Sequence, residues 1–272
     1  MRRYFRMELK RAFLNKRMIL VLLILVGLSV CHYMEHIYPN REYIMGMGDG
    51  YGYLSSFNGW IGGEWGSLEA TWLYLLIPLF CALPYGASWA YDCKSGIGAQ
   101  AMIRGEKAAF LWTKIAVSFL SGAAIVMFAL WFDFLLTSST YPAITPKVGM
   151  GLSFVHARNI LSGLFYEHPF AYISIYIGIN GLYFGLLNTL SLVSRFFTKN
   201  NYIAILTPFL YYMVFHCAGT TSGHMEWAAS GFLSPAQRYE TTWFILIFQI
   251  LLMLVISGLS TRRFIREEEG LL

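Results

Sequence analysis

The residues that could do chemistry are few in this chain, and they form no catalytic pattern. The sequence contains no HExxH, GxSxG or GxxxxGK[ST] motif, the patterns of zinc proteases, serine hydrolases and P-loop nucleotide-binding proteins. Its four cysteines form no CxxC pair and its six histidines are scattered, which predicts neither a disulfide framework nor a metal site. We therefore expect no catalytic, cofactor-binding or metal-binding residue, and no enzymatic activity.

An enzyme that acts inside a membrane would need ionisable groups within its spans, where such groups are rare and usually functional. The groups that could form such a site are His216, His224, Glu226 and Asp133. A carboxylate at the bilayer centre costs roughly 2.5–3.5 kcal/mol, so Asp133 is expected at the outer boundary of its span. We expect alanine at each of these positions to leave activity unchanged.

A charged, glycine-punctuated segment at residues 92–107 separates two long apolar runs. It begins with Asp92 and ends with Lys107, and Lys114 follows just inside the next apolar run. If the flanking runs cross a membrane, this segment forms a short helix at the cytoplasmic surface, held at both ends by a span. Such a helix is well placed to receive a push from a soluble partner. The alternative is a solvated loop that serves membrane topology alone.

The elements that would hold this segment are membrane helices. The chain has 272 residues, of which 57% are hydrophobic and 13% are charged, whereas soluble domains have roughly 45–50% and about 25%. This supply of charge is too small to cover a soluble surface. The apolar runs predict an all-α polytopic membrane protein, with a single transmembrane domain over residues 1–272. Its six predicted spans are residues 18–37, 70–91, 110–136, 169–194, 202–218 and 241–261.

Residues 1–17 are strongly basic and place apolar residues at helical spacing, which predicts an amphipathic helix lying at the membrane interface. A plain basic anchor without a helix is the alternative. Sixteen of the 20 Lys and Arg residues then fall on one side of the membrane and four on the other. Because basic residues favour the cytoplasmic side, both termini are predicted to be cytoplasmic, as six spans require.

Polar residues inside the spans have two possible uses. Those that could line a translocation path are Asn180, Asn188, Tyr211, Tyr212 and Gln249. Hydrogen bonding between helices is the more frequent use of such residues. Gly181 and Gly185 form a GxxxG pair, which lets another helix approach closely, either in this chain or in a second copy.

With these elements in order, the chain resembles the permease subunits of type-2 ABC exporters over nearly its whole length. The shared features are an amphipathic N-terminal helix, six spans with both ends inside, and a helical outer segment before the last span. The most specific feature is a span that ends in an acidic residue, followed by a glycine-containing coupling helix, a basic turn and a lysine inside the next span. The matching positions are Asp92, Gly96 or Gly98, Arg104 and Lys114. Arg104-Gly105 stands where the family often has a proline.

The resemblance implies that a partner ATPase contacts this chain at a defined set of coupling residues. These are Asp92, Gly96, Gly98, Arg104, Lys107 and Lys114. The implied partners are two copies of an ABC ATPase subunit that hold ATP and Mg²⁺, a second permease copy that is identical or different, and membrane lipids, with no nucleic acid. No cofactor is expected in this chain itself.

The resemblance also implies a function. This function is export of an amphipathic or hydrophobic cargo, such as a peptide antibiotic, a drug or a lipid-like molecule, across the plasma membrane of a bacterial cell. Antibiotic resistance would follow from such export. The alternative is a membrane-embedded immunity or sensor protein that binds a toxic peptide without transporting it.

Overall fold

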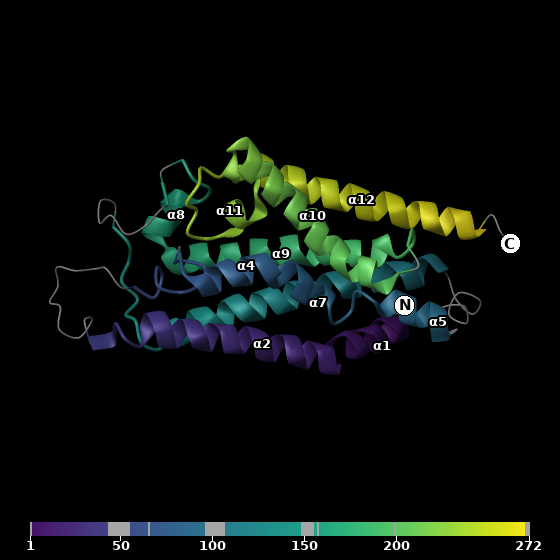
Figure 1. The fold of residues 1–272 in the computed structure, drawn as a ribbon, viewed down its shortest axis with the longest axis horizontal. Helices are drawn as coiled ribbons and strands as arrows, with labels where there is room; N and C mark the ends of the chain where they lie inside the picture. The colour runs from purple at the N-terminus through teal and green to yellow at the C-terminus, as the bar shows by residue number, and fades with distance from the viewer. Residues whose placement is uncertain are drawn as a thin grey trace.

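The computed structural model describes residues 2–42, 55–64, 66–95, 107–147, 155–156, 158–198 and 200–269. Every regular element within these residues is a helix, so the predicted all-α fold class is confirmed. The long helices run close to the long axis of an elongated bundle (Figure 1). In chain order the elements are α1 (Arg2–Phe13), α2 (Lys16–His32), the π-helix η1 (Tyr33–Ile37), α4 (Leu68–Ala82), α5 (Ser88–Ser95), α7 (Lys107–Ser138), α8 (Ser162–Glu167), α9 (Pro169–Ser194), α10 (Asn201–Ser222), the 3-10 helix η2 (Met225–Trp227), α11 (Ala229–Leu233) and α12 (Trp243–Glu269).

Five helical stretches in the described part of the chain are long and apolar enough to cross a membrane. They are Lys16–Ile37, Ala108–Ser138, Pro169–Ser194, Asn201–Ser222 and Trp243–Arg266. The hydrocarbon core of a bilayer needs about 20 apolar residues in a helix, and the shortest of these stretches has 22 residues. The chain is therefore a multi-pass membrane protein.

The region predicted as one span over residues 70–91 is divided into two helices. α4 ends at Ala82 after 15 residues, and α5 begins after a turn. Pro84 lies in this turn, and it lacks the N–H group that a continuous helix needs. At Gly86, an added Cβ would lie 2.6 Å from the Ala82 carbonyl oxygen and 2.8 Å from Ser191 Oγ. The turn therefore packs against α9 too closely for a side chain at this position.

Helices α7 and α9 pack tightly along each other, and glycines make this contact possible. An added Cβ at Gly181 would lie 2.7 Å from Met127 Cγ, and one at Gly185 would lie 2.9 Å from the Phe119 carbonyl oxygen. Small residues allow such close approach between membrane helices. The GxxxG pair therefore serves packing within this chain, which was one of the two alternatives.

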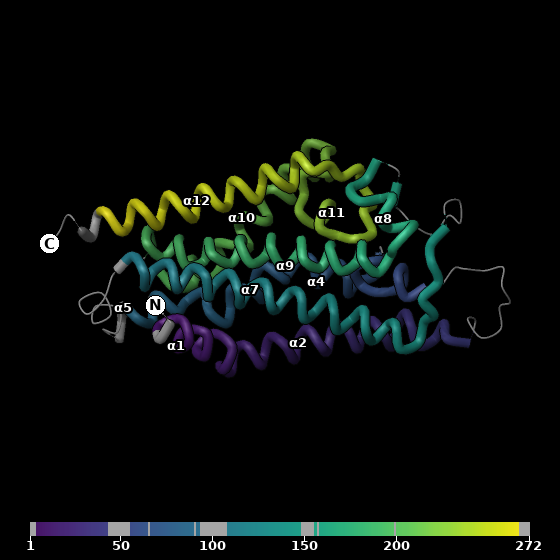
Figure 2. Tube along the Cα trace, turned by 180° about the vertical axis from the view of Figure 1, so that it is seen from behind, coloured from purple at the N-terminus to yellow at the C-terminus, as the bar shows by residue number. Residues whose placement is uncertain are grey.

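The two ends of the bundle carry different elements (Figures 1 and 2). Helices α1 and α5 and the C-terminal end of α12 lie at one end, which we call the terminal end. Helices α8 and α11 lie at the other end, which we call the distal end. The two ends of the described chain thus lie at the same end of the bundle.

Candidate functional site

Charged side chains from three helices meet at the terminal end of the bundle. They are Glu8 and Arg11 from α1, Asp92 from α5 and Lys114 from α7. Lys114 Nζ lies 2.5 Å from Asp92 Oδ2 and 3.3 Å from Glu8 Oε2. Arg11 Nη2 lies 2.6 Å from Asp92 Oδ1, and Arg11 Nη1 lies 2.9 Å from Glu8 Oε1. We call these four residues the charge network.

The charge network is shielded from solvent. The side chains of Glu8, Asp92 and Lys114 are fully buried, whereas that of Arg11 is 29% exposed. Tyr85 adds a further bond, because its hydroxyl donates to Glu8 Oε2 at 2.6 Å. The two acidic groups match the two basic ones, and this balance matters because an uncompensated buried charge costs several kcal/mol.

Arg11 closes the network on its exposed side. Its two terminal nitrogens donate to the two oxygens of Asp92, at 2.6 and 3.3 Å, which is the bidentate geometry that guanidinium groups favour. Burial alone would lower the pKa of Arg11, but the hydrogen bond to Asp92 and the charge of Glu8 outweigh it and hold that pKa above its ordinary value. The guanidinium therefore stays charged wherever the protein is folded.

A polar corner fixes α1 to the start of α2. Asn15 Oδ1 accepts the Met18 N–H at 2.7 Å, which caps α2 in the usual manner of an N-terminal Asn. Asn15 Nδ2 donates to the Ala12 carbonyl oxygen at 2.8 Å and to that of Pro84 at 3.4 Å. The orientation of α1 is thereby set against both α2 and the turn between α4 and α5.

Aromatic side chains pack α5 against two segments from the C-terminal part of the chain. The Trp89 ring stands edge-on to Phe196 and Phe264, with ring centroids 6.1 and 6.0 Å away. Phe196 and Phe264 stack on each other with their centroids 4.3 Å apart. Such aromatic pairs contribute about 0.5–1.5 kcal/mol beyond their buried area. Helix α5 is therefore joined to the turn after α9 and to the end of α12.

The structure places part of the predicted coupling set. It brings Asp92 and Lys114 into direct contact, and Lys107 is the first residue of α7. Gly96, Gly98 and Arg104 lie outside the described residues. The coupling role of all six residues stays a prediction.

Sequence reasoning did not find Glu8, Arg11 and Tyr85 as partners of Asp92 and Lys114. The sequence does carry a signal for Glu8, because it is the single acidic residue in the basic N-terminal stretch. A carboxylate there is not explained by attraction of basic residues to the cytoplasmic side. No local pattern marks Tyr85, which reaches Glu8 over a separation of 77 residues.

The two asparagines predicted to line a path form hydrogen bonds between helices. Asn180 Nδ2 donates to the Leu233 carbonyl oxygen at 2.8 Å. Asn188 Nδ2 donates to the Ser118 carbonyl oxygen at 2.8 Å. Both asparagines are fully buried, so these contacts support the packing use, and a role in a path stays a prediction.

The other predicted path residues differ in their surroundings. Gln249 is fully buried; its Oε1 accepts the Tyr183 hydroxyl at 2.7 Å, and its Nε2 donates to the Trp227 carbonyl oxygen at 2.9 Å. Tyr211 is half-buried on α10. Tyr212 is fully buried and lines a cavity. Of this predicted set, Tyr212 is the residue placed where a ligand could reach it.

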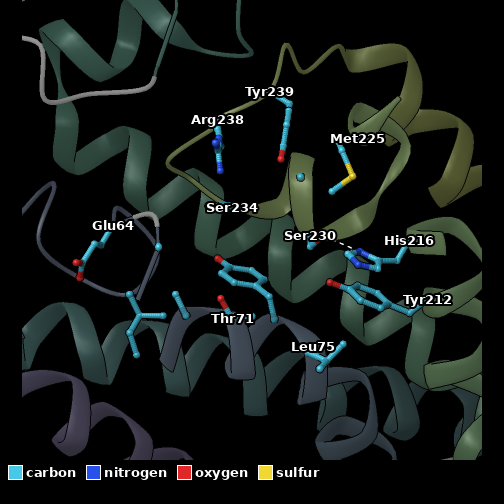
Figure 3. Close-up of a pocket in the computed structure, with 15 residues that line it drawn as sticks. Glu64, Thr71, Leu75, Tyr212, His216, Met225, Ser230, Ser234, Arg238 and Tyr239 are labelled. Atoms are coloured by element: carbon cyan, nitrogen blue, oxygen red, sulfur yellow. Dashed lines mark hydrogen bonds between the residues drawn. The ribbon is translucent and has the colours of Figure 1, made fainter. Parts of the chain in front are cut away.

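The cavity at the distal end has a volume of about 580 Å³. It lies between α4, α10 and the segment that contains η2 and α11, and Figure 3 shows its lining. Tyr212 from α10 points into the same space as Arg238 and Tyr239, which both lie in the segment after α11 (Figure 3). His216 also lines it and is bonded to Ser230, with 3.1 Å between Nδ1 and Oγ. Its size is typical of sites for small organic ligands.

The groups that an intramembrane enzyme could use make separate contacts. Asp133 faces His32, with 3.3 Å between Oδ1 and Nδ1, and is fully buried in α7. His224 and Glu226 form a pair of their own at 2.8 Å, and His216 lies in the cavity wall. The burial of Asp133 is explained by its partner, since a buried carboxylate needs compensating charge or hydrogen bonds.

Comparison of this chain with protein-family models, curated proteins and solved structures finds no match. The class is therefore defined by composition and fold. It is that of a helical, multi-pass membrane protein, here with a buried charge network at one end of its bundle and a cavity at the other.

Proposed function

We propose that this chain is the permease subunit of an ATP-driven exporter of the type-2 ABC class. In this proposal, separate partner subunits bind ATP and Mg²⁺ below the membrane, and two permease chains form the route across the plasma membrane. The resemblance of segment 92–107 to a coupling helix motivates it. The observation that carries it is the charge network, because this network joins the helices on both sides of that segment to α1.

The charge network offers a route for force. A push on segment 92–107 would reach α5 and α7 together, because Asp92 and Lys114 are paired at 2.5 Å. It would also reach α1, because Glu8 contacts Lys114. Helix α7 has 32 residues, or about 48 Å at 1.5 Å per residue, so it extends from the terminal to the distal end. Because α7 is tightly packed on α9, the two helices would move as one unit.

The distal cavity supports an amphipathic cargo. Its lining combines apolar side chains such as Leu75 and Met225 with the polar ends of Tyr212, Arg238 and Tyr239. A ligand that is apolar along most of its length and polar at one end would match this lining. In the proposed cycle, the cavity holds part of the cargo on the outer side before release.

The test is reconstitution with an ABC ATPase subunit sought among the neighbouring genes. The two proteins should co-purify from detergent, and proteoliposomes that contain both should move cargo when ATP is hydrolysed. Arg104→Glu should reduce transport per ATP hydrolysed, because it reverses the charge of the proposed contact. Arg158→Glu is the matched control, since the Arg158 side chain is 82% exposed and belongs to the segment joined to α8 at the distal end. Transport that persists without any nucleotide-binding partner would refute the proposal.

The cavity also favours a second candidate, an immunity or sensor protein that binds a toxic peptide without moving it. A cavity of about 580 Å³ suits retention of a ligand as well as its passage. The two candidates differ in their need for energy. If protection of cells from the peptide survives a partner ATPase that cannot hydrolyse ATP, the binding candidate replaces the exporter.

A further inference from the structure

A second cluster of ionisable side chains lies at the distal end, around the start of α4. Its members come from α2, η1, the loop before α4, the first turn of α4 and α7. They are His32, Glu35, His36, Glu64, Glu69 and Asp133. None of them belongs to the charge network, which lies at the terminal end.

One half of this cluster is closed by contacts among its own members. His32 Nε2 lies 2.8 Å from Glu64 Oε2, and His32 Nδ1 lies 3.3 Å from Asp133 Oδ1. Asp133 Oδ2 accepts the Ile61 N–H at 2.7 Å. Glu64 also lines the cavity, but its side chain points away from the labelled Tyr212 (Figure 3). Here each carboxylate keeps a hydrogen bond of its own, Glu64 with His32 Nε2 and Asp133 with the Ile61 N–H, although His32 Nδ1 and Asp133 Oδ1 make only an ion-pair contact.

The other half is incomplete. Glu69 Oε2 lies 3.3 Å from His36 Nε2. The side chain of Glu69 is more than nine-tenths buried, and within the described residues this oxygen has no hydrogen-bond partner. The Glu35 carboxylate lies close by, and one ligand atom from each of Glu35, His36 and Glu69 falls within 4.8 Å of the others. The buried Oε2 of Glu69 thus faces the Nε2 of His36 and lies near the carboxylate of Glu35.

The charges of the cluster do not balance. It contains four carboxylates and two imidazoles, so two negative charges remain even when both imidazoles are protonated. Uncompensated charge in a poorly solvated site is costly. With His36 as a neutral metal ligand, three negative charges remain, and a bound divalent cation would offset two of them.

We propose that Glu35, His36 and Glu69 form a binding site for a divalent transition-metal cation, best matched by Zn²⁺. Zinc takes imidazole nitrogen and carboxylate oxygen ligands at about 2.0–2.2 Å, which places neighbouring ligands of a tetrahedral site about 3.4 Å apart. The 3.3 Å between His36 Nε2 and Glu69 Oε2 matches this spacing. Glu35 is exposed and is free to rotate toward the ion, and water would fill the fourth position.

The surroundings of His36 suit this role. His36 Nδ1 faces Glu64 Oε1 at 3.7 Å, and a carboxylate on the far side of a histidine ligand orients the ring and leaves the other nitrogen available for the metal. Glu35 and His36 both lie in the π-helix η1, and such local widening of a helix is frequent at functional sites. The metal would join the end of the first span to the start of α4. This inference does not depend on transport.

The experiment is Zn²⁺ titration of the full-length chain in detergent. The protein is purified without a polyhistidine tag, stripped with a chelator, and titrated by calorimetry or against a fluorescent zinc indicator. We expect one Zn²⁺ per chain. Glu69→Gln and His36→Gln should each weaken this binding by at least about tenfold. Glu35→Gln should weaken it too, and it changes an exposed side chain, so misfolding would not explain its effect.

The matched control is His224→Gln combined with Glu226→Gln. This pair has its imidazole and carboxylate 2.8 Å apart at partly exposed positions and should bind no metal, so its removal should leave the Zn²⁺ affinity unchanged. Three results would overturn the inference: no stoichiometric Zn²⁺ binding, binding that Glu35→Gln and His36→Gln leave intact, or binding that the control abolishes. Ca²⁺ binding without Zn²⁺ binding would overturn it as well.

Discussion

Lys114→Met tests whether the charge network holds α1, α5 and α7 together. Met retains much of the Lys volume, so the loss is mainly one of charge. After the change, Glu8 and Asp92 share Arg11 as the remaining cation of the network, so the four positions carry two negative charges and one positive charge. Breaking a buried ion pair in this way costs about 3–5 kcal/mol. With about 2–4 °C per kcal/mol for a chain of this size, we expect the unfolding midpoint to fall by about 6–20 °C.

Removing the opposite charge as well should restore part of this loss. In Asp92→Asn combined with Lys114→Met, the remaining Glu8 and Arg11 still form a balanced pair at 2.9 Å. We therefore expect the double variant to be more stable than Lys114→Met alone. The interaction energy from the double-mutant cycle should be about 3 kcal/mol, at the upper end of measured couplings.

The assay is reversible unfolding in detergent, followed by tryptophan fluorescence. Lys16→Met is the matched control, because Lys16 is an exposed lysine at the terminal end, and such surface changes usually alter stability by less than about 0.5 kcal/mol. The network does not join these helices if Lys114→Met unfolds at the same midpoint as Lys16→Met. The same conclusion follows if the double variant loses more stability than the summed losses of Asp92→Asn and Lys114→Met.

Other predictions concern the packing of the bundle, and each is checked by the unfolding midpoint of the purified variant. Gly185→Ala should destabilise the protein by about 1–3 kcal/mol, because its Cβ would meet backbone as well as side chain of α7. Gly178→Ala is its control: nothing lies within 4 Å of the added Cβ, and we expect a gain of about 0.5–1 kcal/mol. Asn15→Ala should cost about 1 kcal/mol through the lost cap of α2. Gln249→Leu should cost about 1–3 kcal/mol, because it leaves the Tyr183 hydroxyl without its acceptor.

Local features of the fold were predictable from the sequence. Helix α9 covers Pro169–Ser194, the same residues as the predicted fourth span, because an uncharged run behind a first-turn proline leaves little choice of boundaries. The division of residues 70–91 into two helices was harder to predict from the sequence. Pro78 lies inside α4, whereas Pro84 lies in a turn that packs closely against α9 at Gly86, so proline alone does not mark where the helix ends.

Contacts between distant residues could not be predicted from the sequence. The side chain of Lys114 is fully buried against Glu8, 106 residues away. Asp133 was expected at the outer boundary of its span, and its burial depends on His32. The periodicity of the sequence indicates that such groups lie on a helix, but the packing of the bundle determines which other helix they face. The contact between His36 and Glu69 could not be predicted for the same reason, because packing of the bundle brings these two distant residues together.

The most direct test of the account is the side of the membrane on which the terminal end lies. Cys93, in α5 next to Asp92, serves as the reporter after Cys31, Cys81 and Cys217 are replaced by Ser. A membrane-impermeant maleimide is applied to intact cells and to inverted vesicles, with detergent-opened membranes as the control for reactivity. The account predicts labelling in inverted vesicles and protection in intact cells. Labelling of Cys93 in intact cells would place the charge network outside the cell and contradict the account.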